Sequence, residues 1–255
     1  MKILFIGDVV GIAGTNFLSK RLPQLKRENN IDITIVNGEN SAIGNGITRE
    51  SAKLIFDSGA DVITSGNHVW QKKVSYDLLN ENEYIVRPAN YPKESPGVGF
   101  VQLDKIKYKI NIINLLGTVF LDSLDCPFRV CDEILKENKA TINFVDFHAE
   151  ATSEKKAFAM YFANRLSAVV GTHTHVQTND AQIINGTAFI TDVGMVGAQN
   201  SILGIAPEPV INKFITKLPQ TFLPAEGKCF LNGVIIECDE KNGNAIQIET
   251  LNIYE

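Results

Sequence analysis

The sequence predicts an α/β (α+β) fold, a four-layer α/β/β/α sandwich in which two mixed sheets pack face to face and helices cover the outside. Two observations support this prediction. Up to Pro96, short apolar runs alternate with helical patterns, as they do in βαβ units. After Pro96, strand pairs appear. Early crossovers favour parallel strands covered by helices, and later hairpins favour antiparallel strands, so together they predict two mixed sheets.

In the first half, three apolar runs have the length of strands and three other segments have helical periodicity. These strands are predicted at residues 3–6, 33–36 and 62–64, and the helices at 17–28, 49–57 and 74–79. In the second half, residues 99–103 and 109–114 are predicted to pair as a hairpin. Helices are predicted at 128–138 and 153–164, and strands at 141–147, 168–170, 182–184, 188–191, 233–238 and 246–251. No stretch has the composition of a linker, so residues 1–255 are predicted to form one domain.

The composition indicates which classes of binding partner and which cellular compartment the protein has. The formal net charge of −5 is spread over segments of mixed sign, which gives no electrostatic footprint for duplex nucleic acid or anionic lipid. The first apolar run is too short for the core of a signal peptide, and no later run approaches the length of a membrane span. A cytoplasmic location is therefore predicted. A reducing cytosol would keep the four cysteines as thiols: Cys126, Cys131, Cys229 and Cys238.

Polar segments follow five of the predicted strands directly. They are Gly7-Asp8, Asn37-Gly38-Glu39-Asn40, Ser65-Gly66-Asn67-His68, Asp146-Phe147-His148 and Gly171-Thr172-His173-Thr174-His175. Ligand sites in α/β sheets form at the carboxyl ends of strands, and the neighbouring glycines allow sharp turns and close backbone approach. We therefore expect one site assembled from the whole chain.

All four histidines of the chain lie in these segments, which is typical of a metal site. The candidate ligands are Asp8, Glu39, Asn40, Asn67, His148, His173 and His175. A mixture of imidazoles, carboxylates and carboxamides suits Fe, Mn or Zn better than Ca. The set exceeds what one ion can use, which favours two ions with Glu39 as the bridging carboxylate. Two-metal sites of this kind hydrolyse phosphoesters.

These motifs, in this order, resemble the calcineurin-like metallophosphoesterases, and among them the YmdB-like branch. The similarity runs almost from end to end. It includes Ile6-Gly7-Asp8-Val9-Val10-Gly11, Ser65-Gly66-Asn67-His68-Val69-Trp70, Asp146-Phe147-His148-Ala149-Glu150, Val170-Gly171-Thr172-His173-Thr174-His175-Val176-Gln177-Thr178 and Thr191-Asp192-Val193-Gly194-Met195. Each motif alone is weak evidence, but five motifs in the order of the family are specific.

The resemblance implies a ligand set and a reaction. One ion is expected on Asp8, Asn40 and His175, a second ion on Asn67, His148 and His173, and Glu39 is shared between them. Iron is the first expectation for both ions, with Mn or Zn as alternatives. The implied reaction is hydrolysis of small phosphodiesters, including 2′,3′-cyclic nucleotides, by a hydroxide that bridges the metals. His68 would act as the general acid that protonates the leaving oxygen.

The sequence departs from the wider superfamily at two positions, and alternatives stay open. Val10 and Glu39 stand where many members have a histidine and an aspartate, and Asn40 is expected to replace the missing imidazole. His68 could position the substrate instead of acting as the general acid. Asp146 and Glu150, which flank His148, are candidates to orient a ligand. The alternative functions are a phosphomonoesterase on the same metals and a metal-containing regulatory protein that acts through a partner. A polynucleotide nuclease is disfavoured by the acidic charge balance. The resemblance alone suggests a homo-oligomer.

Overall fold

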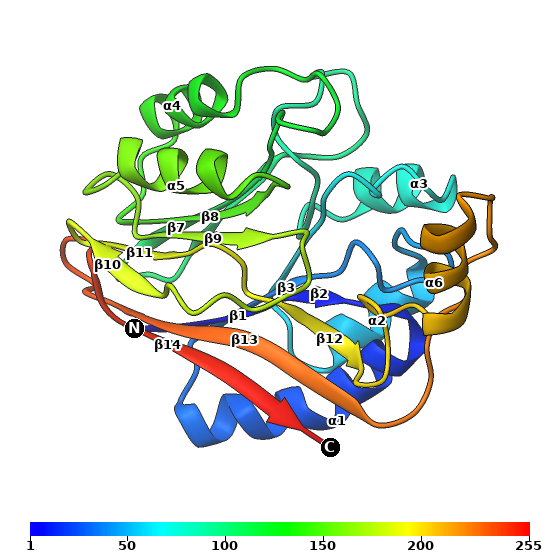
Figure 1. Ribbon diagram of the computed structural model, residues 1–255. Coiled ribbons are helices and arrows are strands. Elements are labelled where there is room, and N and C mark those ends of the chain that lie inside the picture. The colour runs from blue at the N-terminus through cyan, green and yellow to red at the C-terminus, as the bar shows by residue number, and fades with distance from the viewer.

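Two β-sheets face each other in the computed structural model, which describes residues 1–255 (Figure 1). The first sheet has eight strands, which are β1 (Lys2–Ile6), β2 (Asp8–Val9), β3 (Ile33–Asn37), β4 (Val62–Thr64), β5 (Ile85–Val86), β12 (Met195–Ala198), β13 (Cys229–Cys238) and β14 (Ala245–Tyr254). Their order is β2-β12-β13-β1-β3-β4-β5, and β14 pairs with β13. Strands β1, β3, β4 and β5 run parallel, whereas β13 is antiparallel to β1, β12 and β14.

The second sheet has six strands, which are β6 (Phe100–Asp104), β7 (Lys109–Leu116), β8 (Ile142–His148), β9 (Ala168–Thr172), β10 (Gln182–Ile184) and β11 (Thr187–Ile190). Their order is β10-β11-β9-β8-β7-β6. The four central strands are parallel, and the two edge strands are antiparallel to their neighbours. Both sheets are therefore mixed, as predicted, and the carboxyl ends of their parallel strands supply the polar segments.

Six helices complete the fold: α1 (Gly11–Asn29), α2 (Arg49–Asp57), α3 (Val74–Glu81), α4 (Pro127–Glu137), α5 (Thr152–Tyr161) and α6 (Pro207–Thr216). In Figure 1, α4 and α5 lie over the outer face of the second sheet, and α1 lies on the opposite side of the molecule. No helix combines the length and the apolar composition that crossing a bilayer requires.

Three buried apolar clusters separate the four layers. One lies between the first sheet and its helices, one between the two sheets, and one between the second sheet and α4 and α5. The rings of Phe5 on β1 and Phe144 on β8 stack across the sheet interface at 5.5 Å between centroids. Phe147 on β8 instead packs on Phe158 of α5 at 4.5 Å. The four-layer sandwich is thus confirmed.

Strand β1 illustrates why a continuous apolar run folds as an inner strand. Ile3 and Phe5 face the second sheet, while Leu4 and Ile6 face the helices, and all four are fully buried. Side chains alternate between the faces of a strand, so a strand covered on both sides must be apolar at every position. Burial of each such side chain contributes roughly 1.5–3 kcal/mol. The core therefore fixes the register in which the strand ends meet.

Most predicted elements are confirmed, with differences at ends and in short elements. The segments β2, β5, β12 and α6 were not predicted. The first two are two residues long, and β12 contains Gly197, which weakens a strand pattern. Helix α6 starts at Pro207 and contains Pro209, two residues that obscure its periodicity, although proline is well tolerated in a first turn. Strand β13 begins at Cys229, four residues before the predicted start.

Candidate metal centre

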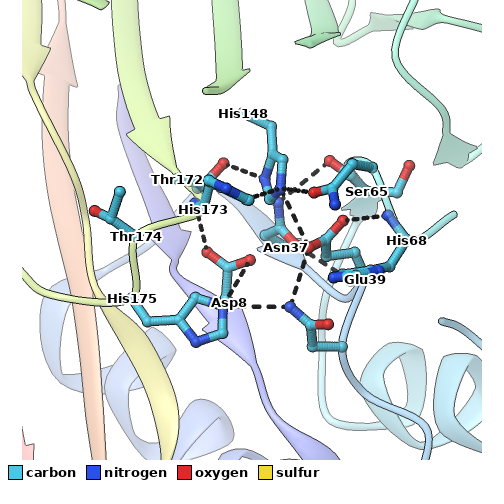
Figure 2. Close-up of polar contacts among 12 residues, drawn as sticks. Asp8, Asn37, Glu39, Ser65, His68, His148, Thr172, His173, Thr174 and His175 are labelled. Carbon is cyan, nitrogen blue, oxygen red and sulfur yellow. Dashed lines mark hydrogen bonds and ion pairs between the residues drawn. The ribbon is translucent and has the colours of Figure 1, made fainter. Parts of the chain in front are cut away.

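The structure brings all seven candidate ligands and His68 together between the two sheets. Asp8 lies on β2 directly after β1, Glu39 and Asn40 follow β3, Asn67 and His68 follow β4, His148 ends β8, and His173 and His175 follow β9. Figure 2 shows the side chains of Asp8, Glu39, His148, His173 and His175 turned toward one another. The site therefore uses strand ends from both sheets.

Three atoms that could bind a metal lie close to one ring nitrogen of His148. Its Nε2 lies 3.0 Å from Asn67 Oδ1, 3.1 Å from His173 Nδ1 and 3.2 Å from Glu39 Oε1. An imidazole nitrogen carries either one proton or one lone pair, so it satisfies only one of these neighbours. The ligand atoms of Glu39, His148 and His173 lie within 4.8 Å of one another, a grouping that could hold a metal ion. The donor set fits a transition-metal cation.

A second group of donors surrounds Asp8. Its Oδ1 lies 3.6 Å from His175 Nε2, and that nitrogen lies 3.3 Å from Asn40 Nδ2. Asp8 is fully buried, and its Oδ1 has no hydrogen-bond partner. A buried carboxylate oxygen without a partner is costly unless a cation or a proton satisfies it. This orphaned oxygen is a second indication that the residues present fit a metal.

Glu39 connects the two groups. Its Oε1 faces His148 and also accepts a hydrogen bond of 3.0 Å from Asn40 Nδ2, and its Oε2 accepts one of 3.1 Å from the backbone N–H of His68. A half-turn of the Asn40 amide exchanges its oxygen and nitrogen, so that an oxygen can face a cation without any backbone movement. The carboxylate therefore contacts side chains of both groups.

Within the cluster, protonated histidines balance the negative charges of the carboxylates. Burial opposes the charged forms of all these groups. The carboxylates of Glu39 and Asp8 outweigh burial at His148 and raise its pKa to about 9. Burial likewise opposes ionisation of Asp8, but the charges of His175 and His148 lower its pKa. The pKa of Glu39 is also lowered, chiefly by His148, against its burial.

Metal loading is therefore expected to release protons. Because the pKa of His148 lies near 9, this ring is protonated at pH 7, and a cation must displace that proton to reach Nε2. We expect release of at least one proton per chain when chelated protein takes up Mn²⁺ at pH 7, because the pKa of His175, another candidate ligand, is also raised by Asp8 against its burial. Calorimetry in two buffers of different ionisation enthalpy measures this number. Metal uptake without any proton release would contradict the placement of His148 at the ion.

Glycine next to the ligands is required by close packing. A Cβ on Gly66 would lie 2.3 Å from both Glu39 Oε2 and His148 Cδ2, and one on Gly7 would lie 2.0 Å from the carbonyl oxygen of Gly194. No side chain fits at either position. These two glycines are thus explained by close contacts: Gly66 lies against the side chains of Glu39 and His148, and Gly7 lies against the backbone of Gly194.

A hydrogen-bonded relay orients His148. Its Nδ1 lies 2.9 Å from Thr172 Oγ1, and that hydroxyl donates to Asp146 Oδ1 at 2.7 Å. Asn37 Nδ2 donates to the other oxygen of Asp146 at 2.9 Å. Such a relay directs Nε2 toward the centre, as the outer partners of metal-bound histidines do. Asp146 thus contacts His148 through Thr172. Glu150 instead contacts His173, with 3.0 Å between its Oε2 and the histidine Nε2.

A buried ion pair holds the loop that carries His173 and His175, and sequence reasoning missed it. Lys155 Nζ on α5 donates to Asp192 Oδ2 at 2.9 Å and to the Thr172 carbonyl at 2.8 Å. Asp192 Oδ2 also accepts hydrogen bonds from the backbone N–H and hydroxyl of Thr174. Both charges are fully buried. A helical lysine is ordinarily exposed, so the only signal in the sequence was Asp192 after an apolar run.

Replacing Lys155 with methionine is expected to lower the free energy of unfolding by about 3–5 kcal/mol, because Asp192 would be left buried without its partner. Urea unfolding followed by circular dichroism measures the loss. The matched control is Lys156→Met on the same helix. Lys156 Nζ lies over the Phe189 ring at 5.1 Å, a contact expected to contribute about 1 kcal/mol. Equal losses in the two variants would show that the ion pair does not hold the loop.

A cavity of about 290 Å³ opens onto the cluster. Glu39, Asn40, His68, His173 and His175 line one part of it, and His68 is half-buried there. The imidazole of His68 therefore borders the space in which a substrate would sit, although its side chain is not one of the converging donors.

The family model described as YmdB-like protein matches residues 4–251. The chain belongs to the YmdB-like family. A relative from Bacillus subtilis (strain 168), named 2′,3′-cyclic-nucleotide 2′-phosphodiesterase, is 47% identical over 258 residues, which cover 100% of this chain and 98% of the relative. The predicted membership of the YmdB-like branch is confirmed.

Two solved structures share the whole fold of this YmdB-like protein. A hypothetical protein from Thermus thermophilus has a TM-score of 0.95 and 41% identity, with 100% of both chains covered. A protein of Mycoplasma pneumoniae, described as a novel phosphatase, has a TM-score of 0.95 and 36% identity, with 100% of this chain and 93% of the other covered. The YmdB-like chain is therefore an enzyme of the phosphodiesterase and phosphatase class.

Proposed function

We propose that this enzyme hydrolyses small phosphodiesters, with 2′,3′-cyclic nucleotides as substrates, at a centre of two transition-metal ions. The observation that carries the proposal is the convergence of donors on His148 Nε2 next to the orphaned Oδ1 of Asp8, with Glu39 between them. The name of the Bacillus subtilis relative supports the choice of a cyclic diester. Iron is the first expectation, and Mn or Zn is the alternative.

The contacts support a division of the ligands into two sets that share Glu39. Asp8, Asn40 and His175 would hold one ion, and Asn67, His148 and His173 the other. When bound, the pair supplies Lewis acidity to the phosphoryl oxygens and lowers the pKa of a water nucleophile. The protein contributes the orientation: the Thr172 relay aims His148, and the Lys155–Asp192 pair fixes the loop of His173 and His175.

His68 is the proposed general acid. Its backbone is fixed by the 3.1 Å hydrogen bond from its N–H to Glu39 Oε2, and its side chain borders the cavity. In the hydrolysis of a 2′,3′-cyclic phosphate, water adds to phosphorus, the bond from phosphorus to O2′ breaks, and O2′ takes a proton. A ribose alkoxide leaves poorly without that proton, so an acid beside the phosphate accelerates this step. We assign the donation of this proton to O2′ to His68.

A phosphomonoesterase is the second candidate, because the Mycoplasma pneumoniae relative is described as a phosphatase and the same metals would serve. The two functions separate in one assay of the purified enzyme. Adenosine 2′,3′-cyclic phosphate and adenosine 3′-monophosphate are supplied at equal concentration, before and after treatment with a chelator. We expect chelator-sensitive turnover of the diester to exceed that of the monoester. Faster turnover of the monoester would replace the proposal with a phosphatase.

A further inference from the structure

Most apolar residues that line the cavity come from a segment that the metal chemistry does not use. Residues 199–228, here called the strap, connect β12 to β13 and contain α6. The strap is closed on itself near the cavity by isolated bridges from Ile205 to Ile202 and to Pro224. Two backbone hydrogen bonds reinforce this closure, from Ala206 N–H to the Leu223 carbonyl at 2.9 Å and from Ala225 N–H to the Gly204 carbonyl at 2.8 Å. The cavity wall therefore has an ordered backbone.

The strap is also fixed against the candidate metal centre. The Leu203 carbonyl lies 3.2 Å from Nδ1 of His175. Gly204 has φ +90°, and a Cβ there would lie 2.4 Å from Cγ1 of Val10, so the strap packs tightly on the turn after β2. The positions of the apolar wall and of the ligands are thus set relative to each other.

The cavity has two chemically different sides. Polar groups of the candidate centre form one side, and Leu203, Ile205, Phe222 and Pro224 of the strap contribute to the other. Leu203 and Phe222 remain 46% and 42% exposed. Lys213 Nζ lies over the Phe222 ring, 4.9 Å from its centroid, a contact that favours the observed ring position. An aromatic ring held at the edge of a polar site is suited to bind a flat, apolar group.

We propose that the strap side of the cavity is the nucleobase site of this hydrolase and that Phe222 is its stacking residue. The inference rests on the proposed function, because a phosphate on the polar side directs the rest of a nucleotide toward the strap. Stacking a base on an aromatic ring depends little on which base is present. The wall residues are apolar, so the site binds purines and pyrimidines without strict selection.

The test compares a nucleotide with its base-free counterpart. The substrates are adenosine 2′,3′-cyclic phosphate and methyl riboside 2′,3′-cyclic phosphate, which carries a methoxy group in place of the base. The variants are Phe222→Ala and, as matched control, Phe214→Ala. Phe214 lies on α6, is 68% exposed and does not line the cavity. We expect Phe222→Ala to lower kcat/KM for the nucleotide about 10- to 100-fold, with less than about threefold change for the base-free substrate. Phe214→Ala should leave both unchanged.

A binding measurement keeps the base site testable apart from turnover. Calorimetry with adenosine 3′-monophosphate on the metal-loaded protein should show about tenfold or greater weakening in Phe222→Ala and none in Phe214→Ala. Phe222→Tyr, which keeps the ring, should restore binding. Failure of the wild type to hydrolyse either diester, together with binding that depends on Phe222, would remove the proposed function and leave the base site. Equal losses on both substrates, or binding that is indifferent to Phe222, would overturn the base site.

Discussion

Replacing His68 with alanine is expected to lower kcat for adenosine 2′,3′-cyclic phosphate by about 10²- to 10⁴-fold while the metal content stays at the wild-type value. The side chain borders the cavity without belonging to the converging donors, and only its backbone N–H contacts Glu39. The loss therefore falls on proton transfer to the leaving oxygen. Steady-state kinetics and elemental analysis of the same preparation check both parts of the expectation.

A second substrate separates proton donation from substrate positioning by His68. A p-nitrophenyl diester has an acidic leaving group that departs without help from an acid, so His68→Ala should affect its hydrolysis much less than that of the nucleotide. Equal losses on both substrates would assign His68 to positioning. Full activity of the variant with its metals bound would contradict any direct role of this histidine.

Replacing Glu39 with glutamine is expected to have an effect of a different kind. The change removes a carboxylate whose Oε1 contacts side-chain ligand atoms of both groups, His148 on one side and Asn40 on the other. Loss of a partner that merely orients a ligand costs about 10- to 100-fold in metal affinity. Loss of the shared ligand should exceed about 100-fold, so Glu39→Gln should be isolated without a full pair of ions and with little turnover.

The matched control for Glu39 is Glu150→Gln. This carboxylate lies 3.0 Å from Nε2 of His173 but is half exposed, at 48% for the side chain, and it borders the cluster from outside. We expect at most about a tenfold loss of metal affinity, measured by competition with a chelator. A Glu39 variant that keeps its metals as well as the Glu150 variant does would contradict the shared carboxylate.

The fold was largely predictable because each layer leaves its own periodic signal. The doubly buried β1 reads as an unbroken apolar run, and α2 begins at a capping box between Thr48 and Ser51. The strand ends were predictable for the same reason, since Asp8, His148 and His173 lie in the polar segments that end apolar runs. Short elements without a period, such as β2 and β5, leave no such signal. That residues 1–255 form one domain stays a prediction.

The rest of the site depends on contacts between remote segments. Lys155 and Asp192 are 37 positions apart and meet only because α5 packs on the second sheet. The partnership of Thr172 with Asp146 depends in the same way on the pairing of β8 with β9. Neither contact has a local pattern in the chain. The candidate ligands were predicted from the polar residues at strand ends, whereas the groups that orient them required the folded structure.

The central claim is that two metal ions at the Asp8, Glu39 and His148 cluster perform diester hydrolysis. The most direct test is elemental analysis of the purified protein, coupled to turnover of adenosine 2′,3′-cyclic phosphate before chelation, after chelation and after return of Fe, Mn or Zn. We predict two transition-metal ions per chain and turnover that disappears and returns with them. A protein that binds no metal and hydrolyses no diester after any of these metals is restored would contradict the claim.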